Sequence, residues 1–229
     1  MKKNAIVLCS GGIDSIVTSY YIRKKLKYCK MIILFFDYGQ KSLKKERKCS
    51  ILCSKKLGAK FTELKLEWLG EISQSLINKS GRIKRLKRKD LKDTRKESEK
   101  YYVPCRNAIF LVYALALAES LYVKKKEIYN IFVGFKNEGK ESYPDTTKEF
   151  VRQINQLAKI STINKGKIIA PLIEKDKEDI ILLGKKLGIN FKDTFSCYVG
   201  NKHCGRCLAC MLRKEGFYWA NLKDETDYA

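Results

Sequence analysis

The residues best suited to chemistry form the hexapeptide Ser10-Gly-Gly-Ile-Asp-Ser15 near the start of the chain. Its two glycines let the backbone approach an anion where a Cβ atom would obstruct it, and its two serines can donate hydroxyl groups. Asp14 would repel an anion unless a cation lies between them, and Mg²⁺ is the obvious cation. The hexapeptide therefore predicts a pyrophosphate site with bound magnesium. The residues expected to bind the pyrophosphate-bearing cofactor and its magnesium ion are Cys9, Ser10, Gly11, Gly12, Asp14, Ser15 and Asp37.

Local elements must hold this hexapeptide in place. An apolar segment, residues 4–9, precedes it, and a helical pattern follows over residues 14–26. A strand, a tight turn and a helix in this order direct several backbone N–H groups and the positive end of a helix at one point. The hexapeptide lacks the Gly-Lys-Ser/Thr ending of a Walker A loop. A strand-turn-helix without a ligand is the alternative, and the order of the six residues favours nucleotide binding.

A second group of reactive residues lies near the carboxyl end, with the spacing C-x6-C-x2-C-x2-C. Its members are Cys197, Cys204, Cys207 and Cys210. Four thiolates can surround one zinc ion tetrahedrally and leave no position for a substrate, so the site would be structural. We expect zinc. An iron–sulfur cluster also uses four cysteines and stays open as the alternative. We expect a helix to begin at Cys210 and His203 to be an exposed turn residue.

Size and composition limit the class of protein. The chain has 229 residues, 45% of them hydrophobic, which is enough for one sizeable core. Residues 2–4 lead directly into a strand, so we expect no signal peptide, and the apolar run 108–118 is too short to span a bilayer. These features predict a cytoplasmic protein with no membrane contact. Nine cysteines in that compartment indicate thiols and metal rather than disulfides.

The formal net charge is +23. Lysine is spread over the whole chain, which favours solvated faces over a polyanion partner for most of this charge. Residues 79–100 differ, since they hold eleven Lys or Arg against four Asp or Glu. We interpret this segment as a mobile basic loop that covers a phosphate-bearing ligand or contacts a protein or nucleic-acid partner.

Strand-like and helix-like segments alternate along the chain, which predicts an α/β fold, an open parallel sheet with helices on both faces. The expected strands are residues 4–9, 31–36, 61–66 and 128–133, and the expected helices are 14–26, 41–57, 108–121, 145–161 and 175–187. Ligands of open parallel sheets bind at the carboxyl ends of the strands. The segments after three strands, residues 10–15, 37–40 and 134 onward, should therefore share one cleft.

With a nucleotide loop at one end and a four-cysteine cluster at the other, the chain resembles the 7-cyano-7-deazaguanine synthase (QueC) family of the ATP pyrophosphatases. The matching segments are Ser10–Ser15, Asp37–Gln40 with Glu46, Val103–Asn107, Tyr143–Asp145 with Glu149 and Phe150, Pro171 and Leu172 with Lys177, Thr194–Tyr198, and Cys204–Phe217. The resemblance implies an adenine nucleotide alpha hydrolase-like domain over residues 1–190 and a small zinc-binding element over residues 191–229.

The resemblance also implies a reaction. ATP would activate the carboxylate of 7-carboxy-7-deazaguanine, ammonia would displace the activated oxygen to give an amide, and a second activation would dehydrate the amide to the nitrile. ATP, Mg²⁺ and Zn²⁺ are the implied cofactors. Asp14, Arg106 and Lys177 are the implied catalytic residues, with ordinary surface charge as the alternative for the two cations. The implied substrate contacts are Asp145, Ser196 and Tyr198.

The chain departs from the usual family pattern at Cys105, which replaces a Gly, at Gly139, which replaces an Asp, and at Thr146, which replaces a Cys. These departures cluster on the presumed substrate side. They leave room for a QueC-like ligase of an antiviral defence system that joins a deazaguanine acid to a protein or other amine. A basic zinc-ribbon protein that binds nucleic acid and has a regulatory nucleotide site is the alternative of another class. We expect the chain to form a homodimer.

Overall fold

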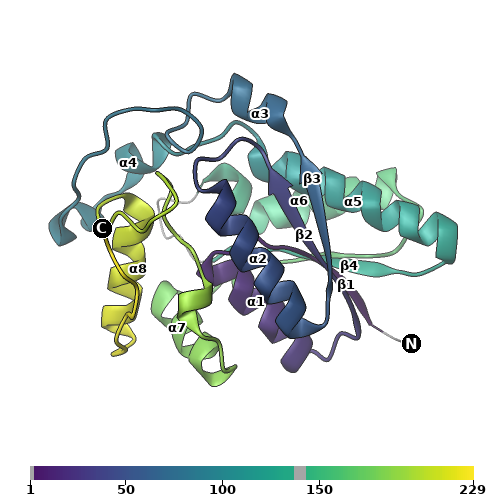
Figure 1. Cartoon of the computed structure of the whole chain (residues 1–229). Coiled ribbons are helices and arrows are strands. Elements are labelled where there is room, and N and C mark those ends of the chain that lie inside the picture. The colour runs from purple at the N-terminus through teal and green to yellow at the C-terminus, as the bar shows by residue number, and fades with distance from the viewer. Residues whose placement is uncertain (1–2, 137–142) are drawn as a thin grey trace.

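A single parallel sheet organises the chain, as the computed structural model of residues 3–136 and 143–229 shows (Figure 1). Gly139 lies outside these described residues. The sheet has the strand order β3-β2-β1-β4-β5, and all four strand pairs are parallel. The strands are β1 (Asn4–Leu8), β2 (Lys30–Asp37), β3 (Lys60–Lys65), β4 (Tyr129–Phe132) and β5 (Ile168–Ile169). The four expected strands are confirmed, and the two-residue β5 is an addition.

The inner strands read as continuous apolar runs because helices cover both of their faces. Every residue of β1 is buried, and so are all residues of β2 after Lys30. In the register of the sheet, Ile6 of β1 lies between Ile32 of β2 and Ile131 of β4. This central row of branched side chains forms the middle of the core.

Helices pack on both faces of the sheet, as expected. The longer helices are α1 (Ile13–Lys24), α2 (Leu43–Leu57), α5 (Arg106–Lys125), α6 (Lys148–Ser161), α7 (Lys177–Lys186) and α8 (Leu208–Trp219). Helices α1, α2 and α7 lie on one face, and α5 and α6 cover the other (Figure 1). Helix α8 then packs against α7, where Gly216 faces Lys177 and Ile181. The division of the chain at residue 190 stays a prediction.

Helix α5 is longer than the sequence pattern predicts, because it continues to Lys125. Its 20 residues are long and apolar enough to cross a membrane, judged by length and composition alone. The expectation that the apolar part of this helix is too short to span a bilayer is therefore wrong. In this fold α5 packs on β1 and β4 and buries Leu111, Ala114, Leu115 and Ala118.

Helix α6 begins later than expected, at Lys148, because the Thr147 hydroxyl accepts the N–H of Phe150 and caps the first turn. Residues Pro144–Thr146 before it form a separate 3₁₀ turn, labelled η3. Helix α8 begins at Leu208 with Cys207 as its N-cap, so the expected start at Cys210 is wrong by two residues.

The basic segment 79–100 has structure of its own. It contains the 3₁₀ helix η1 (Arg88–Lys92) and the short helix α4 (Arg95–Glu99), and it follows another short helix, α3 (Glu67–Ile72). Leu86 is buried and its N–H donates to the Arg206 carbonyl, while Arg88 pairs with Glu215 of α8. The segment is therefore anchored on the C-terminal part of the chain. Its mobility and its role over a ligand or against a partner stay predictions.

Candidate active site

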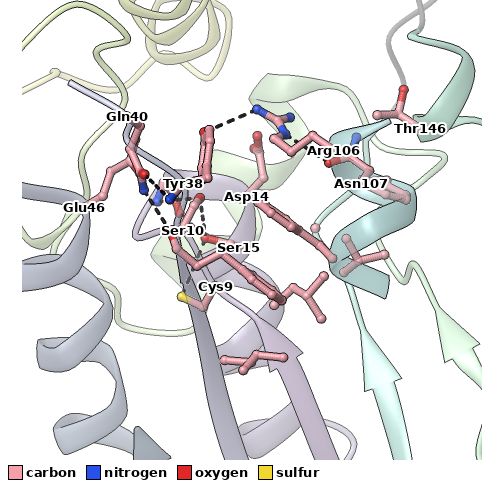
Figure 2. A pocket seen from close by; sticks show the side chains of 18 of the residues that line it. Cys9, Ser10, Asp14, Ser15, Tyr38, Gln40, Glu46, Arg106, Asn107 and Thr146 are labelled. Carbon is pink, nitrogen blue, oxygen red and sulfur yellow. Dashed lines mark hydrogen bonds between the residues drawn. The ribbon is translucent and has the colours of Figure 1, made fainter. Parts of the chain in front are cut away.

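A cavity of about 250 Å³ opens at the carboxyl ends of β1, β2 and β4. Figure 2 shows side chains from the loops after these strands and from the start of α5 meeting around it. Seven of the residues selected from the sequence line the cavity: Cys9, Ser10, Gly12, Asp14, Ser15, Arg106 and Tyr198. The five other residues expected to bind the nucleotide, to contact the substrate or to act in catalysis are not among its lining residues: Gly11, Asp37, Asp145, Lys177 and Ser196.

The turn between β1 and α1 has the geometry of an anion cradle. Gly12 is the N-cap of α1, so the positive end of the helix opens into the cavity. The Ser15 hydroxyl donates to the Gly12 carbonyl at 3.0 Å and lies 3.4 Å from the Ser10 hydroxyl. The cavity thus offers hydroxyl groups and free helix N–H groups from adjacent residues.

Gly11 serves a different purpose from the one that its place in the hexapeptide suggests. Its φ of +81° is left-handed, and a Cβ there would lie 2.6 Å from the Glu46 carbonyl oxygen and 2.9 Å from the Cys49 Cβ. A glycine is required because α2 packs tightly against the turn.

Asp14 faces a cation from another part of the chain. The Lys177 Nζ lies 2.7 Å and 2.8 Å from its two carboxylate oxygens, and both side chains are largely buried. Lys177 is the first residue of α7, 163 positions from Asp14. The ion pair brings two of the three expected catalytic residues together.

Arg106, the third, enters the cavity from the first turn of α5. Its Nη1 lies 3.5 Å from the Tyr38 hydroxyl (Figure 2). Burial raises the pKa of Tyr38 to about 12, so this phenol is neutral at physiological pH. The Asp145 carboxylate accepts the N–H of Asn107 at 3.2 Å and so holds the first turn of α5.

A hydrogen-bonded pair on the cavity wall was not assigned a role from the sequence. Glu46 accepts the Ser42 hydroxyl at 2.6 Å and the Gln40 amide at 3.1 Å, and Gln40 also accepts the N–H of Tyr38. Burial raises the pKa of the Glu46 carboxyl. The sequence signal for the pair was its presence in the Asp37–Gln40 motif with Glu46.

Asp37 lies outside the cavity lining, because its carboxylate is engaged elsewhere. The Arg47 Nη2 lies 3.0 Å from it and 2.6 Å from Glu63 of β3. This ion-pair group ties α2 to the ends of β2 and β3.

Aromatic rings make up much of the remaining wall. Phe36 and Phe110 stack with their centroids 4.0 Å apart, and Tyr38 contacts the same Phe110 edge-on. Tyr143 and Tyr198 line the cavity as well. Flat apolar walls with a few polar groups suit a heteroaromatic base.

The four cysteines of the C-terminal cluster converge. Their sulfur atoms lie within 4.8 Å of one another, and those of Cys197 and Cys207 are 4.0 Å apart. Tetrahedral ligands about 2.3 Å from one zinc ion would be separated by about 3.8 Å. A multi-iron cluster would place its own iron and sulfide atoms between the thiolates and force them farther apart. The cluster therefore fits one tetrahedral ion such as zinc.

His203 beside this cluster is not the exposed turn residue we expected. Its ring lies 4.5 Å from that of Phe195 and 5.8 Å from that of Tyr228, and its Nε2 accepts the N–H of Ser196. Burial lowers the pKa of His203 to about 4. The side chain is thus a neutral packing residue that fixes the backbone at Ser196.

Comparison with known proteins places this chain in a family. The sequence family described as queuosine biosynthesis protein QueC matches residues 4–221. The chain belongs to the QueC family. It is 37% identical to the 7-cyano-7-deazaguanine synthase of Methanosphaera stadtmanae, with 100% of this chain and 99% of that protein covered. It is 36% identical to the synthase of Methanocaldococcus jannaschii, with 98% of both chains covered.

Solved structures of two other synthetases are also similar to this QueC-family chain. An NMN synthetase from Francisella tularensis has a TM-score of 0.44 at 16% identity, covering 96% of this chain and 84% of that chain. A 4-thiouridine synthetase in an RNA complex with bound ATP has a TM-score of 0.49 at 16% identity, covering 94% and 53%.

Two departures from the usual QueC pattern fall at the described site. Cys105 has a φ of +52°, a left-handed conformation that the usual glycine adopts without strain. Thr146 is buried in the cavity lining, and its hydroxyl donates to the Tyr143 carbonyl at 2.9 Å. The first departure changes backbone strain before α5, and the second changes one polar contact.

Proposed function

We propose that this chain converts 7-carboxy-7-deazaguanine and ammonia to 7-cyano-7-deazaguanine with ATP. The observation that carries the proposal is end-to-end similarity to relatives named 7-cyano-7-deazaguanine synthase. The cavity supports it, because an anion cradle and an aromatic wall lie together at the carboxyl ends of the strands.

The chemistry is two rounds of carboxyl-type activation. In the first, a carboxylate oxygen of the acid attacks the α-phosphorus of ATP, the bond to the β-phosphate oxygen breaks, and pyrophosphate leaves. Ammonia then attacks the acyl carbon and AMP leaves, which gives the amide. In the second round the amide oxygen is adenylated in the same way, and loss of AMP and protons gives the nitrile.

The chain's own residues have to bind and align charges more than they have to supply a nucleophile. We assign pyrophosphate binding to the start of α1, through the hydroxyl groups of Ser10 and Ser15 and the backbone at Gly12. Asp14 is the carboxylate available for Mg²⁺, which would neutralise phosphate charge and would share Asp14 with Lys177. Arg106 faces the cavity as a second cation for the phosphates or the substrate carboxylate.

We assign a structural zinc ion to Cys197, Cys204, Cys207 and Cys210. Three of these side chains are buried, and all four would be ligands, so no position is left for a substrate. Asp145 acts, in this proposal, by accepting the N–H of Asn107 at the start of α5. Tyr198 contacts the substrate, and a substrate contact at Ser196 stays a prediction.

The test is an incubation of the zinc-loaded chain with 7-carboxy-7-deazaguanine, ATP, Mg²⁺ and an ammonium salt. We expect AMP, pyrophosphate and a product lighter than the acid, identified by mass spectrometry. Asp14→Asn should stop pyrophosphate release while the variant keeps its zinc and its melting temperature. Adenylate without amide or nitrile would make ammonia the wrong acceptor, and a mass shift on a co-encoded protein would then be sought. No adenylate with this acid would refute the assigned substrate.

We infer that the chain acts in the cytoplasm as a homodimer. The outer face of α5 exposes Val112 (47%) and Tyr113 (41%), and Ile160 (85%) and Ile163 (72%) are exposed at the end of α6. Helix α5 contacts the chain just after α6, because Glu119 of α5 accepts the N–H of Ile163. A second copy would bury this apolar face.

Light scattering tests the homodimer. Val112→Glu with Ile160→Glu should give monomers, whereas a similar change on the other face of the sheet, Leu182→Glu, should not. A wild-type monomer at micromolar concentration would refute the homodimer.

The anchored segment 79–100 is the candidate surface for a nucleic-acid partner. The Arg88 guanidinium lies 4.0 Å over the Tyr218 ring, and Trp219 beside it is 63% exposed. Basic groups beside exposed aromatic rings suit single-stranded nucleic acid. A gel shift that weakens steeply with salt and is lost in Lys87→Glu with Lys89→Glu, but not in Lys124→Glu with Lys125→Glu, would support this surface. A shift that is equal in both double variants would indicate general basicity.

A further inference from the structure

We propose that Arg213 of α8 is a positioning residue for the pyrophosphate loop, through the segment 191–196 and the Gly11 carbonyl. This inference rests on the assignment of pyrophosphate binding to the turn before α1. Arg213 belongs to the Cys-x-x-Arg part of the C-terminal cysteine segment, and it does not line the cavity.

Arg213 is almost wholly buried, with 1% of its surface exposed. Its Nη1 donates to the Thr194 hydroxyl at 2.7 Å, and its Nη2 donates to the Phe191 carbonyl at 3.1 Å. Asp224 balances its charge, with 3.2 Å between Nε and Oδ2. A planar guanidinium with several donors in fixed directions can hold two points of one segment at once, which a lysine cannot do.

The segment that Arg213 holds passes directly over the pyrophosphate loop. The N–H of Phe195 donates to the Gly11 carbonyl at 2.9 Å. A Cβ added at Gly12 would lie 3.6 Å from the Phe195 carbonyl oxygen, so both glycines of the loop lie against this residue. The side chain of Phe195 is itself buried, which gives the segment a fixed depth.

The Phe195 hydrogen bond determines where the N–H of Gly12 points. The peptide bond between Gly11 and Gly12 is trans, so its C=O and N–H groups point in opposite directions. Because the Gly11 carbonyl points to Phe195, the Gly12 N–H points to the cavity side, where it donates to the Ser10 Oγ at 3.4 Å. The donor that an oxygen of pyrophosphate would accept from is thereby aimed before the ligand arrives.

Glycines on both sides make this peptide easy to turn over. Neither Gly11 nor Gly12 has a Cβ that would resist rotation about the bonds flanking the peptide. Without the Phe195 hydrogen bond, the plane could rotate and present the Gly11 carbonyl oxygen to the phosphates. An electronegative oxygen there would repel the ligand, so the held orientation is a condition for tight binding.

Two substitutions test this chain of contacts. Arg213→Lys keeps a charge opposite Asp224 but loses the fork to Thr194 and Phe191. Thr194→Val removes the hydroxyl that accepts from Arg213 and that donates to the Phe191 carbonyl, and it leaves Arg213 in place. Glu215→Gln is the matched control, because it removes an ion pair of the same helix with Arg88 and does not touch the segment 191–196.

The probe is inorganic pyrophosphate with Mg²⁺, titrated by calorimetry into the zinc-loaded chain, with zinc content, melting temperature and the KM for the acid measured alongside. We expect both test variants to weaken pyrophosphate binding about tenfold, the scale of one hydrogen bond to a charged group. Their zinc content and their KM for the acid should stay at the wild-type values. Glu215→Gln should bind pyrophosphate as the wild type does.

Wild-type pyrophosphate affinity in both Arg213→Lys and Thr194→Val would overturn the proposal. So would an equal loss of affinity in Glu215→Gln, because the effect would then be general destabilisation of α8. If Arg213→Lys fails to fold, Thr194→Val alone decides. If the wild-type chain itself binds neither pyrophosphate nor ATP, the assignment of the loop is refuted, a result distinct from failure of the Arg213 contact.

Discussion

Replacing each loop glycine by alanine should separate folding from ligand binding. At Gly11 an added Cβ would lie 2.6 Å from the Glu46 carbonyl oxygen and 2.9 Å from the Cys49 Cβ, so α2 would have to move. The left-handed φ of +81° adds about 1–2 kcal/mol for an alanine, and the overpacking adds about 1–3 kcal/mol. We expect Gly11→Ala to lose about 2–5 kcal/mol of unfolding free energy.

Gly12→Ala is the matched control, because the same methyl group meets no obstacle there. Its φ is −75°, and an added Cβ would lie 3.4 Å from the Ser10 Oγ and 3.6 Å from the Phe195 carbonyl oxygen. Its stability should change by less than about 1 kcal/mol. The methyl group lies beside the cradle, however, so pyrophosphate should bind about tenfold more weakly or worse.

Thermal unfolding and pyrophosphate titration distinguish the two effects. At about 2–4 °C per kcal/mol for a chain of this length, Gly11→Ala should melt about 10 °C below the wild type. Gly12→Ala should melt within about 3 °C of it. If Gly11→Ala melts with the wild type, the close approach of α2 does not explain this glycine. If Gly12→Ala melts as low as Gly11→Ala, both glycines serve folding and the cradle argument fails.

Three further substitutions probe the site and the metal cluster. Cys207→Ala should lower both zinc content, by elemental analysis, and melting temperature, because metal binding is coupled to local folding; full zinc content would contradict the assigned ligand set. Lys177→Met keeps the side-chain stem that packs on Gly216 but removes the cation that pairs with Asp14. ATP turnover, measured by pyrophosphate release, should fall at least about tenfold, while the free energy of unfolding changes by about 1 kcal/mol. Wild-type turnover would make the ion pair incidental. Glu46→Gln should raise the melting temperature at neutral pH. The Glu46 pKa is higher in the folded chain than in the unfolded chain, so wild-type stability falls as the pH rises from the unfolded pKa through the folded pKa. The gain should vanish at pH values well below about 4, where the carboxyl is protonated in both states. A gain that persists in acid would assign it to packing instead.

The sequence alone predicted the features that depend on neighbours along the chain. Continuous apolar runs indicated the buried strands of a parallel sheet, and their carboxyl ends located the cavity. The hexapeptide indicated an anion-binding turn, and the cysteine spacing indicated a metal cluster whose sulfur atoms do converge within 4.8 Å. These features depend on local geometry and on burial, both of which residue type and spacing record directly.

Tertiary structure alone decided which partner each polar group has. Lys177 meets Asp14 across 163 positions, and Gly11 is required by the backbone of Glu46 and by Cys49 on α2. The orientation of the Gly12 N–H depends on Phe195, and the basic segment 79–100 is anchored by α8. Periodicity reports that one face of an element is buried, but not which distant element covers it. A hydrogen bond or an ion pair needs two specific atoms within about 3 Å, and only the packing of the whole chain brings such atoms together.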